Sequence, residues 1–230
     1  MEARQRLFLF DEQISKLSGI DASRAFRLVL EKGWTQRSPS FHAALETAAL
    51  ATAARIWHEA HRLETFEAAL AMQDRLVSLI IGSDFLYGDP PPETEVPVPA
   101  YARDRTLSLG ERKSIARKPD RKYLAAALRD PHPEVIQRLL SNPRLTESDA
   151  VFIAARRPVP PAVLTELGCH PKWRVAERVA FALISNPHTP LRISLSLLHN
   201  VGRPRLRELM AATSIAEPVR DALSDLAAFK

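Results

Sequence analysis

One predicted helix in the first third of the chain carries three histidines and a glutamate at positions that could hold a metal ion together. His58 and His61 lie three positions apart, and His42 and Glu46 precede them on the same predicted helix. A zinc-protease helix needs two histidines four positions apart, and a carboxylate-bridged site needs repeated Glu-x-x-His pairs. Neither pattern is present. We therefore expect these residues to pack between helices, with a metal site as the alternative, and we predict no cofactor.

The single cysteine, Cys169, lies in the sequence Gly168-Cys169-His170-Pro171 at the end of a predicted helix. One cysteine forms no internal disulfide and no multi-cysteine metal or iron–sulfur site. A Cys and a His that are adjacent in sequence do not form a catalytic dyad, because the fold normally brings such partners together. We interpret Cys169 as a structural residue and predict that the protein is not an enzyme.

Basic residues recur near the ends of helices predicted in the C-terminal half. Residues 107–230 carry 20 basic and 12 acidic residues, a net charge of +8, whereas residues 1–85 carry −1 and residues 86–106 carry −2. Aligned on one face, the basic side chains would suit phosphate groups; otherwise they form a solvated helical surface. The candidate binding surface is Arg156, Arg157, Lys172, Arg174, Arg178, Arg203, Arg205 and Arg207.

The elements that carry these residues are predicted to be helices. Of 230 residues, 46% are hydrophobic and 26% are charged, and 18 prolines stand against 7 glycines. Alanine and leucine prevail, which favours an all-α fold with proline-marked turns and excludes global disorder. The longest apolar run, Leu76 to Gly82, is far below the roughly 20 residues of a membrane helix. We therefore expect a cytoplasmic protein, and the excess of arginine over lysine suggests a bacterial source.

Three segments are predicted. Residues 1–85 have one proline and form a helical bundle. Residues 86–106 are a proline-rich linker or strap. Residues 107–230 form short helices that must stack to be stable. Four helices are expected in the first segment, at 2–17, 21–32, 38–61 and 64–81. Gly33 is expected to end the second of them and Gly82 the fourth. The helices expected in the last segment are 108–116, 120–129, 132–141, 146–157, 160–168, 173–185, 189–201, 204–213 and 216–228.

An internal repeat is the strongest signal. Leu139-Leu140-Ser141-Asn142-Pro143 matches Leu183-Ile184-Ser185-Asn186-Pro187 at an offset of 44 residues, and the same offset maps Pro160 onto Pro204. Each 44-residue unit would hold three helices. A fixed period in this range is typical of an α-solenoid, in which neighbouring units supply one another's core.

The repeated pieces resemble known helical repeats. Asp130-Pro131-His132-Pro133-Glu134-Val135 followed by Leu139-Leu140 resembles the first helix of a HEAT repeat. Asn186-Pro187-His188-Thr189-Pro190, with Leu195 and Leu198 after it, resembles the leucine-rich repeat variant. The resemblance covers residues 107–230 and implies a HEAT/armadillo-like α-solenoid. Some leucine-rich repeat variant proteins carry a cysteine-ligated cluster, which one cysteine does not permit.

The expected function is a non-catalytic protein–protein interaction module or adaptor with an unidentified protein partner. The alternative is a nucleic-acid-binding protein that uses the basic solenoid face. Helical-repeat alkylpurine DNA glycosylases grip DNA with such a solenoid, but no matching catalytic aspartate is found here. Trp173 is expected to anchor the repeat core rather than to stack on a base. The oligomeric state is left open.

Overall fold

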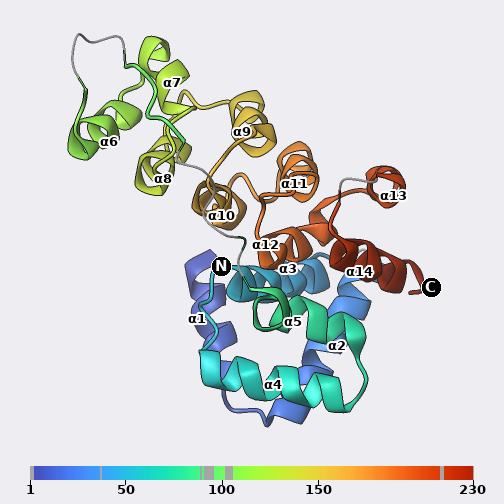
Figure 1. Cartoon of the computed structure of the whole chain (residues 1–230). Helices are drawn as coiled ribbons and strands as arrows, with labels where there is room; N and C mark the ends of the chain where they lie inside the picture. Colours follow the sequence, from blue (N-terminus) through green and yellow to red (C-terminus); the bar gives the residue numbers. More distant parts are fainter. Residues whose placement is uncertain are drawn as a thin grey trace. The chain divides into compact units, whose positions relative to one another are not determined.

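The computed structural model describes residues 3–36, 38–88, 90, 96–101, 106–212 and 215–229. Over this part of the chain the protein consists of α-helices and one 3-10 turn without any strand, which confirms the all-α prediction (Figure 1). The elements are α1 (Ala3–Ile14), α2 (Gly19–Thr35), α3 (Pro39–Ala53), α4 (Glu59–Ala71), α5 (Arg75–Tyr87), α6 (Leu109–Arg117), α7 (Arg121–Ala127), α8 (Pro133–Leu140), α9 (Glu147–Ala155), α10 (Pro161–Cys169), α11 (Glu177–Ile184), α12 (Leu191–Ser196), η1 (Leu198–Asn200), α13 (Arg203–Ala211) and α14 (Glu217–Ala227).

The chain divides into two compact units. Unit 1 combines Met1–Asp89 with Leu191–Lys230, and unit 2 is Pro90–Pro190. This division differs from the expected one, in which residues 107–230 form a single domain after a linker. Helices α12 and α14 pack with the N-terminal ones instead: α12 packs on α3 and α5, and α14 packs on α5. Helix α13 packs on α14.

Polar contacts fix α12 and η1 against α3. Arg192 is buried, and its guanidinium donates a hydrogen bond to the carbonyl oxygen of Ala53, the last residue of α3. Nε2 of His199 lies 2.6 Å from a carboxylate oxygen of Glu46, and the side-chain amide of Asn200 donates to the same oxygen at 3.1 Å. These contacts span more than half of the sequence, which explains why local patterns did not reveal them.

The segment expected to hold four helices holds five, α1 to α5. The predicted helix 38–61 is broken at Arg55, whose φ is +53°. The predicted helix 64–81 is replaced by α4 and α5, which are separated by Gln73 at φ +56° and by Asp74, the N-cap of α5. Residues other than glycine rarely adopt positive φ, so neither break has a local signature.

Two glycines expected to end helices lie inside them. α2 continues past Gly33, and α5 continues past Gly82 with a kink at that residue. A Cβ on Gly33 would lie 2.8 Å from Cδ2 of Leu45, and a Cβ on Gly82 would overlap the ring of Phe66. Both glycines are therefore required for the close approach of a neighbouring helix rather than for a helix stop.

A buried ion pair joins α4 to α5. Arg62 is 3% exposed and donates to both carboxylate oxygens of Asp84, at 2.6 and 2.8 Å, and to the carbonyl oxygen of Ile81 at 2.7 Å. Its guanidinium lies 4.1 Å from the centre of the Phe85 ring. Burial raises the pKa of Asp84, but the hydrogen bond and charge of Arg62, with the charge of Arg55, hold it below its ordinary value.

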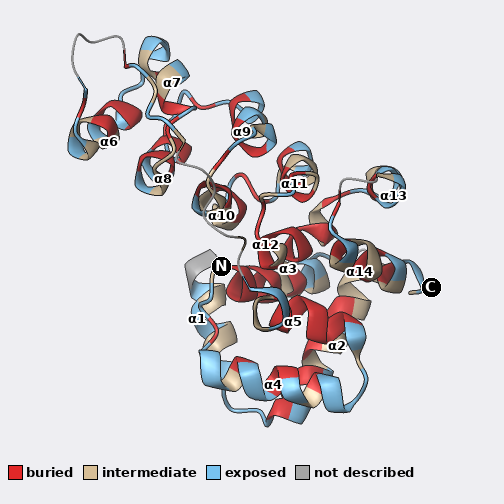
Figure 2. Ribbon diagram, in the orientation of Figure 1, coloured by how far each residue is buried: buried red, intermediate tan, exposed pale blue. Residues whose placement is uncertain are grey.

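In unit 2 the helices alternate between two rows. Helices α6, α8 and α10 form one row, and α7, α9 and α11 form the other (Figure 1). Their buried residues face the helices packed against them (Figure 2). Helices of one row start at 109, 133 and 161, and those of the other at 121, 147 and 177, which are 24 to 30 residues apart. The stacking unit is therefore two helices, whereas the sequence pattern predicts three in 44 residues.

Side chains that follow a helix cap the helix two before it. The amide of Asn142, after α8, donates to two carbonyl oxygens at the end of α6, at 2.8 and 2.9 Å. Asn186, after α11, donates in the same way to the end of α9, at 2.7 and 3.1 Å. Trp173 caps the end of α8 at 2.8 Å, and Arg156 caps the end of α7 at 3.1 Å. The last carbonyls of a helix have no partner within it, so these bonds satisfy them and align each row.

The proline-rich segment 86–106 begins with the last residues of α5, and its Tyr101 is bound to Asp130 of unit 2. Its residues 89, 91–95 and 102–105 lie outside the described residues. Tyr101 is buried, and its hydroxyl donates a hydrogen bond to Asp130 at 2.5 Å. The fully buried Asp130 also accepts from the guanidinium of Arg112 at 2.7 Å. Burial and the neighbouring carboxylate raise the pKa of Tyr101 above its ordinary value.

Candidate functional site

The eight basic residues of the predicted binding surface form two groups, one in each unit. Unit 2 holds Arg156, Arg157, Lys172, Arg174 and Arg178. Unit 1 holds Arg203, Arg205 and Arg207, all on α13.

Arg174 is not a surface residue, contrary to the prediction. Its side chain is fully buried, and its Nε donates a hydrogen bond to the carbonyl oxygen of Gly168 at 3.0 Å. The sequence predicts a helix over 173–185 with Arg174 and Arg178 one turn apart on its outer side. Helix α11 begins only at Glu177, so Arg174 belongs to the turn before it and faces the core.

Two further arginines of unit 2 bind the backbone. Arg156 is half-buried and caps the end of α7. Burial lowers the pKa of its guanidinium, the charge of Asp130 opposes this, and repulsion from Arg129 adds to it. Arg157 is exposed and donates to the carbonyl oxygen of Ser185 at 2.8 Å. Both side chains hold helix ends together.

Lys172 and Arg178 are the members of this group whose side chains extend from the surface. The Lys172 ammonium lies 4.0 Å from the centre of the Trp173 ring. Trp173 itself is 3% exposed, as expected for a residue that anchors the core. Of the five basic residues predicted to bind a partner in unit 2, two therefore remain as candidates for contact with a polyanion.

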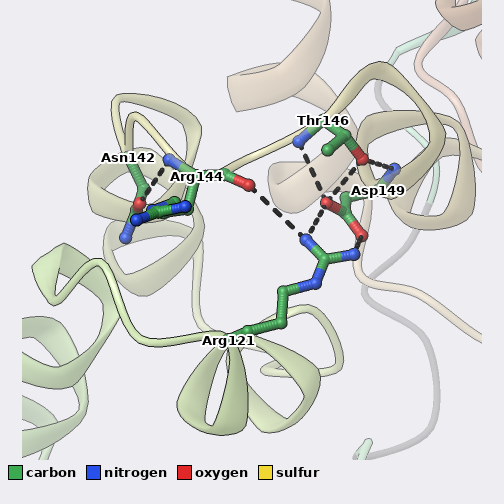
Figure 3. Close-up of polar contacts among 5 residues, drawn as sticks. All are labelled: Arg121, Asn142, Arg144, Thr146 and Asp149. Carbon is green, nitrogen blue, oxygen red and sulfur yellow. Dashed lines mark hydrogen bonds and ion pairs between the residues drawn. The ribbon is translucent and has the colours of Figure 1, made fainter.

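A polar network joins two neighbouring helices of one row of unit 2, α7 and α9. Arg121 at the start of α7 donates to both carboxylate oxygens of Asp149 on α9, at 2.6 and 3.0 Å (Figure 3). Thr146 also donates to Asp149, and the Asn142 side chain accepts from the backbone N–H of Arg144 at 2.9 Å. Burial raises the pKa of Asp149, but the hydrogen bonds of Arg121 and Thr146 hold it below its ordinary value. The charge of Arg121 is thereby neutralised by Asp149 within unit 2.

An apolar pocket in unit 1 brings two of the α13 arginines together. Arg203 and Arg207 are one turn apart, are exposed, and share a face of α13 with Leu206 and Met210, in the spacing of one helical stripe. Arg205 lies off this stripe. The pocket is lined by Trp34, Arg203, Leu206, Arg207, Met210, Leu223, Leu226, Ala227 and Phe229.

Two aromatic residues from distant parts of the chain complete the lining. Trp34 lies in the last turn of α2, and Gly33 beside it lets this turn approach α3 closely. The guanidinium of Arg27, two turns earlier on α2, lies 4.7 Å from the centre of the Phe229 ring. Arg27 is paired with Asp74 at 3.0 Å. This pairing fixes Arg27, which in turn holds Phe229 against α2.

The size and lining of the pocket limit what it can bind. Its volume is about 200 Å³, below the roughly 300–1,000 Å³ of most small-molecule sites. It therefore suits one large side chain better than a whole cofactor. The described lining is hydrocarbon and aromatic, with two guanidinium groups as its ionisable members. Such a lining supplies apolar contact and attraction for anions.

Two of the four residues considered for a metal site, His61 and Glu46, are hydrogen-bonded to other groups. The indole of Trp57 donates to Nδ1 of His61 at 2.9 Å. Glu46 is bound to His199, and the ring of His42 lies 5.7 Å from that of His199. Within the described ranges, no three or more ligating side chains are grouped so that they could hold an ion.

The comparisons with known proteins add no relative. No protein-family model matches the chain, and neither a curated protein nor a solved structure is significantly similar to it. Among the described helices, none has the length and apolar character needed to cross a membrane.

Two arginines of the pocket were among the predicted binding residues, but the pocket itself was not predicted. The local signal was present, because Leu206 and Met210 interleave with Arg203 and Arg207 to give an apolar stripe with basic neighbours on one helix. The aromatic lining had no such signal. It comes from α2 and from the end of α14, and only the folded unit joins these segments.

Proposed function

We propose that the protein is a non-catalytic interaction module that binds a protein partner through the pocket between α2, α13 and α14. The apolar, arginine-edged lining of this pocket carries the proposal. Interfaces are dominated by a few anchors that fill desolvated pockets, and aromatic residues, methionine and arginine are enriched there. Trp34, Met210, Arg203 and Arg207 are of these types.

The lining favours binding over catalysis. General acid–base catalysis needs a group that can exchange a proton near neutral pH, and covalent catalysis needs an activated nucleophile. The described lining combines guanidinium groups with hydrocarbon and aromatic side chains. Guanidinium groups remain protonated in proteins and serve to bind anions.

For unit 2 we propose a short α-solenoid of the HEAT-like type. The alternation of helices between two rows and the recurrent capping by Asn142 and Asn186 support this assignment. Repeat arrays of this kind offer extended surfaces for partners. The fold alone does not identify a partner, so the docking proposal rests on unit 1.

Nucleic-acid binding by unit 2 is the second candidate function, and the positive charge of this unit favours it. Residues 107–190 contain 14 basic and 8 acidic residues, a net charge of +6. Binding of a 20-base-pair duplex or a 20-mer single strand at 50 mM salt, with an affinity that falls steeply as salt rises, would support it. Replacing Lys172 and Arg178 by alanine would then weaken binding. Absence of binding at 50 mM salt would remove this candidate.

Site-specific photo-crosslinking tests the docking proposal. The photoreactive residue benzoylphenylalanine replaces Met210 in the pocket or, as the matched control, Leu63 on α4 of the same unit. The two native side chains are similarly exposed, at 39% and 40%. We expect a single protein to be crosslinked from position 210 and not from position 63. The product should disappear when Arg203 and Arg207 are both replaced by glutamate.

Two outcomes would contradict the proposal. Equal crosslinking from both positions would mean that the contacts are not specific to the pocket. Crosslinking of nucleic acid from position 210 would mean that the pocket serves the other class of partner.

A further inference from the structure

We infer that the pocket between α2, α13 and α14 recognises an acidic peptide segment with one large apolar side chain at its centre. This inference rests on the proposed function and specifies its partner. The apolar side chain enters the pocket, and carboxylates on either side of it in the partner pair with Arg203 and Arg207.

The pocket accommodates one anchor side chain. Its volume of about 200 Å³ suits a phenylalanine, leucine or tryptophan, and apolar side chains of α13 and α14 line much of it. Burying such a side chain removes apolar surface from water, which favours binding. Met210, which is 39% exposed beside the pocket, can adjust to the shape of the anchor.

The charge at the pocket comes from α13. Neither Arg203 nor Arg207 is in an ion pair with another described residue, whereas Arg27 is paired with Asp74 and Arg75 with Asp221 on the adjacent surface. The guanidinium groups of Arg203 and Arg207 are therefore available to carboxylates of a partner. Arginine and carboxylate form strong, directed hydrogen bonds because both groups can bind through two atoms.

The spacing of the arginines sets the spacing of the acids. Residues one helical turn apart are separated by about 6 Å along the axis. In an extended peptide, residues two positions apart are separated by about 6.6 Å and lie on the same side. Because successive side chains point to opposite sides, the acids that share the side of the anchor are those two positions before and after it. A peptide of the form acid–x–anchor–x–acid thus presents the apolar side chain to the pocket and its carboxylates to the long side chains of Arg203 and Arg207 on either side.

The charge of unit 1 favours a peptide over a nucleic acid. Unit 1, including its undescribed residues, has 16 basic and 16 acidic residues and hence no net charge. Nucleic-acid binding depends on the neutralisation of many phosphates by a basic surface. Two arginines beside an apolar pocket in a neutral unit instead fit a short acidic segment.

Fluorescence anisotropy with labelled synthetic peptides tests the inference on the full chain. The probe is fluorescein-Gly-Ser-Glu-Asp-Phe-Glu-Asp-Ser-Gly. One control peptide has alanine in place of phenylalanine, and another has lysine in place of every acidic residue. We expect binding of the probe that rises as salt is lowered, and at least tenfold weaker binding of both controls.

Protein variants distinguish the pocket from general charge. R203E and R207E should each weaken probe binding at least tenfold. R24E changes the net charge equally but alters an exposed residue outside the pocket, and it should change the affinity less than twofold. Because these side chains are exposed, circular dichroism should show unchanged folding.

Three results would overturn the inference. Equal binding of the lysine peptide would exclude charge recognition, equal binding of the alanine peptide would exclude the anchor, and equal loss in R24E would exclude the pocket. If one of these three results is obtained while photo-crosslinking from position 210 still captures one protein, the inference fails and the proposed function stands. If neither peptide nor protein is bound there, both fail. Preferred binding of a single-stranded 12-mer at the pocket would overturn both in favour of a nucleic acid.

Discussion

Removal of the Asn142 side chain should destabilise unit 2 strongly, although the residue lies outside any helix. Its amide donates to two carbonyl oxygens at the end of α6, at 2.8 and 2.9 Å, and its oxygen accepts from the N–H of Arg144 at 2.9 Å. Alanine would leave three backbone groups without these partners, and a buried unpaired group costs about 1–3 kcal/mol. Since two of the three sites are only partly buried, we expect the free energy of unfolding of unit 2 to fall by about 2–4 kcal/mol.

Three comparison variants sharpen this prediction. N142D keeps the size and the acceptor but places a carboxylate against two carbonyl oxygens, so it should be less stable than N142A. N186A removes the equivalent contacts to α9 and should cost a similar amount. Replacement of the exposed Ser141 by alanine should change stability by less than about 0.5 kcal/mol.

The assay must report on unit 2 alone, because a two-unit chain need not unfold in one step. Trp173 is the single tryptophan of unit 2, while Trp34 and Trp57 belong to unit 1. Urea unfolding followed by 19F NMR of 5-fluorotryptophan therefore separates the two units. If N142A unfolds within 0.5 kcal/mol of the wild type, or if N142D is more stable than N142A, the capping argument is refuted.

Three further predictions follow from the buried groups. G82A should destabilise unit 1 by about 1–3 kcal/mol in urea, because its methyl group overlaps Phe66, whereas G110A meets no atom within 4 Å and should not destabilise unit 2; equal effects would exclude overlap as the cause. R62M should destabilise unit 1 by about 3–5 kcal/mol by leaving a buried carboxylate without its main partner, and a loss below 1 kcal/mol would contradict this role. Burial, and to a smaller extent the charge of Lys172, lowers the pKa of His170 in the folded chain. The unfolded chain therefore binds a proton at this residue more readily than the folded chain does. The stability of unit 2 should therefore fall as pH drops below about 6.5, and H170N should reduce this fall in urea titrations at pH 7.5 and 5.5; an unchanged pH dependence would refute it.

The helices of the C-terminal half were predictable because their ends are marked locally. Thr146 and Ser108 cap α9 and α6 through capping boxes, and proline opens α8 and α10. These signals depend on residues within one turn, so they act in the same way in any context. There are two exceptions. Helix α11 starts only at Glu177, after a turn that buries Arg174, and the predicted helix 189–201 is divided into α12, which ends at Ser196, and the 3-10 turn η1.

Long-range contacts were not predictable from such signals. The packing of α12 on α3 depends on Arg192 reaching the end of α3 and on His199 reaching Glu46, and neither residue differs in type from a surface residue. The same applies to the pocket. Its basic edge was visible as charge on α13, but Trp34 and Phe229 join it only through the fold.

If an acidic peptide with an apolar anchor occupies the pocket beside Trp34, the environment of the Trp34 ring changes on binding. The most direct measurement is the 19F spectrum of the 5-fluorotryptophan-labelled chain during titration with the Glu-Asp-Phe-Glu-Asp probe. We expect the resonance of Trp34 to shift in a saturable manner, while those of Trp57 and Trp173, which are 2% and 3% exposed and lie outside the pocket, stay unchanged. An unchanged Trp34 resonance under saturating probe, or an equal shift with the lysine peptide, would contradict the claim.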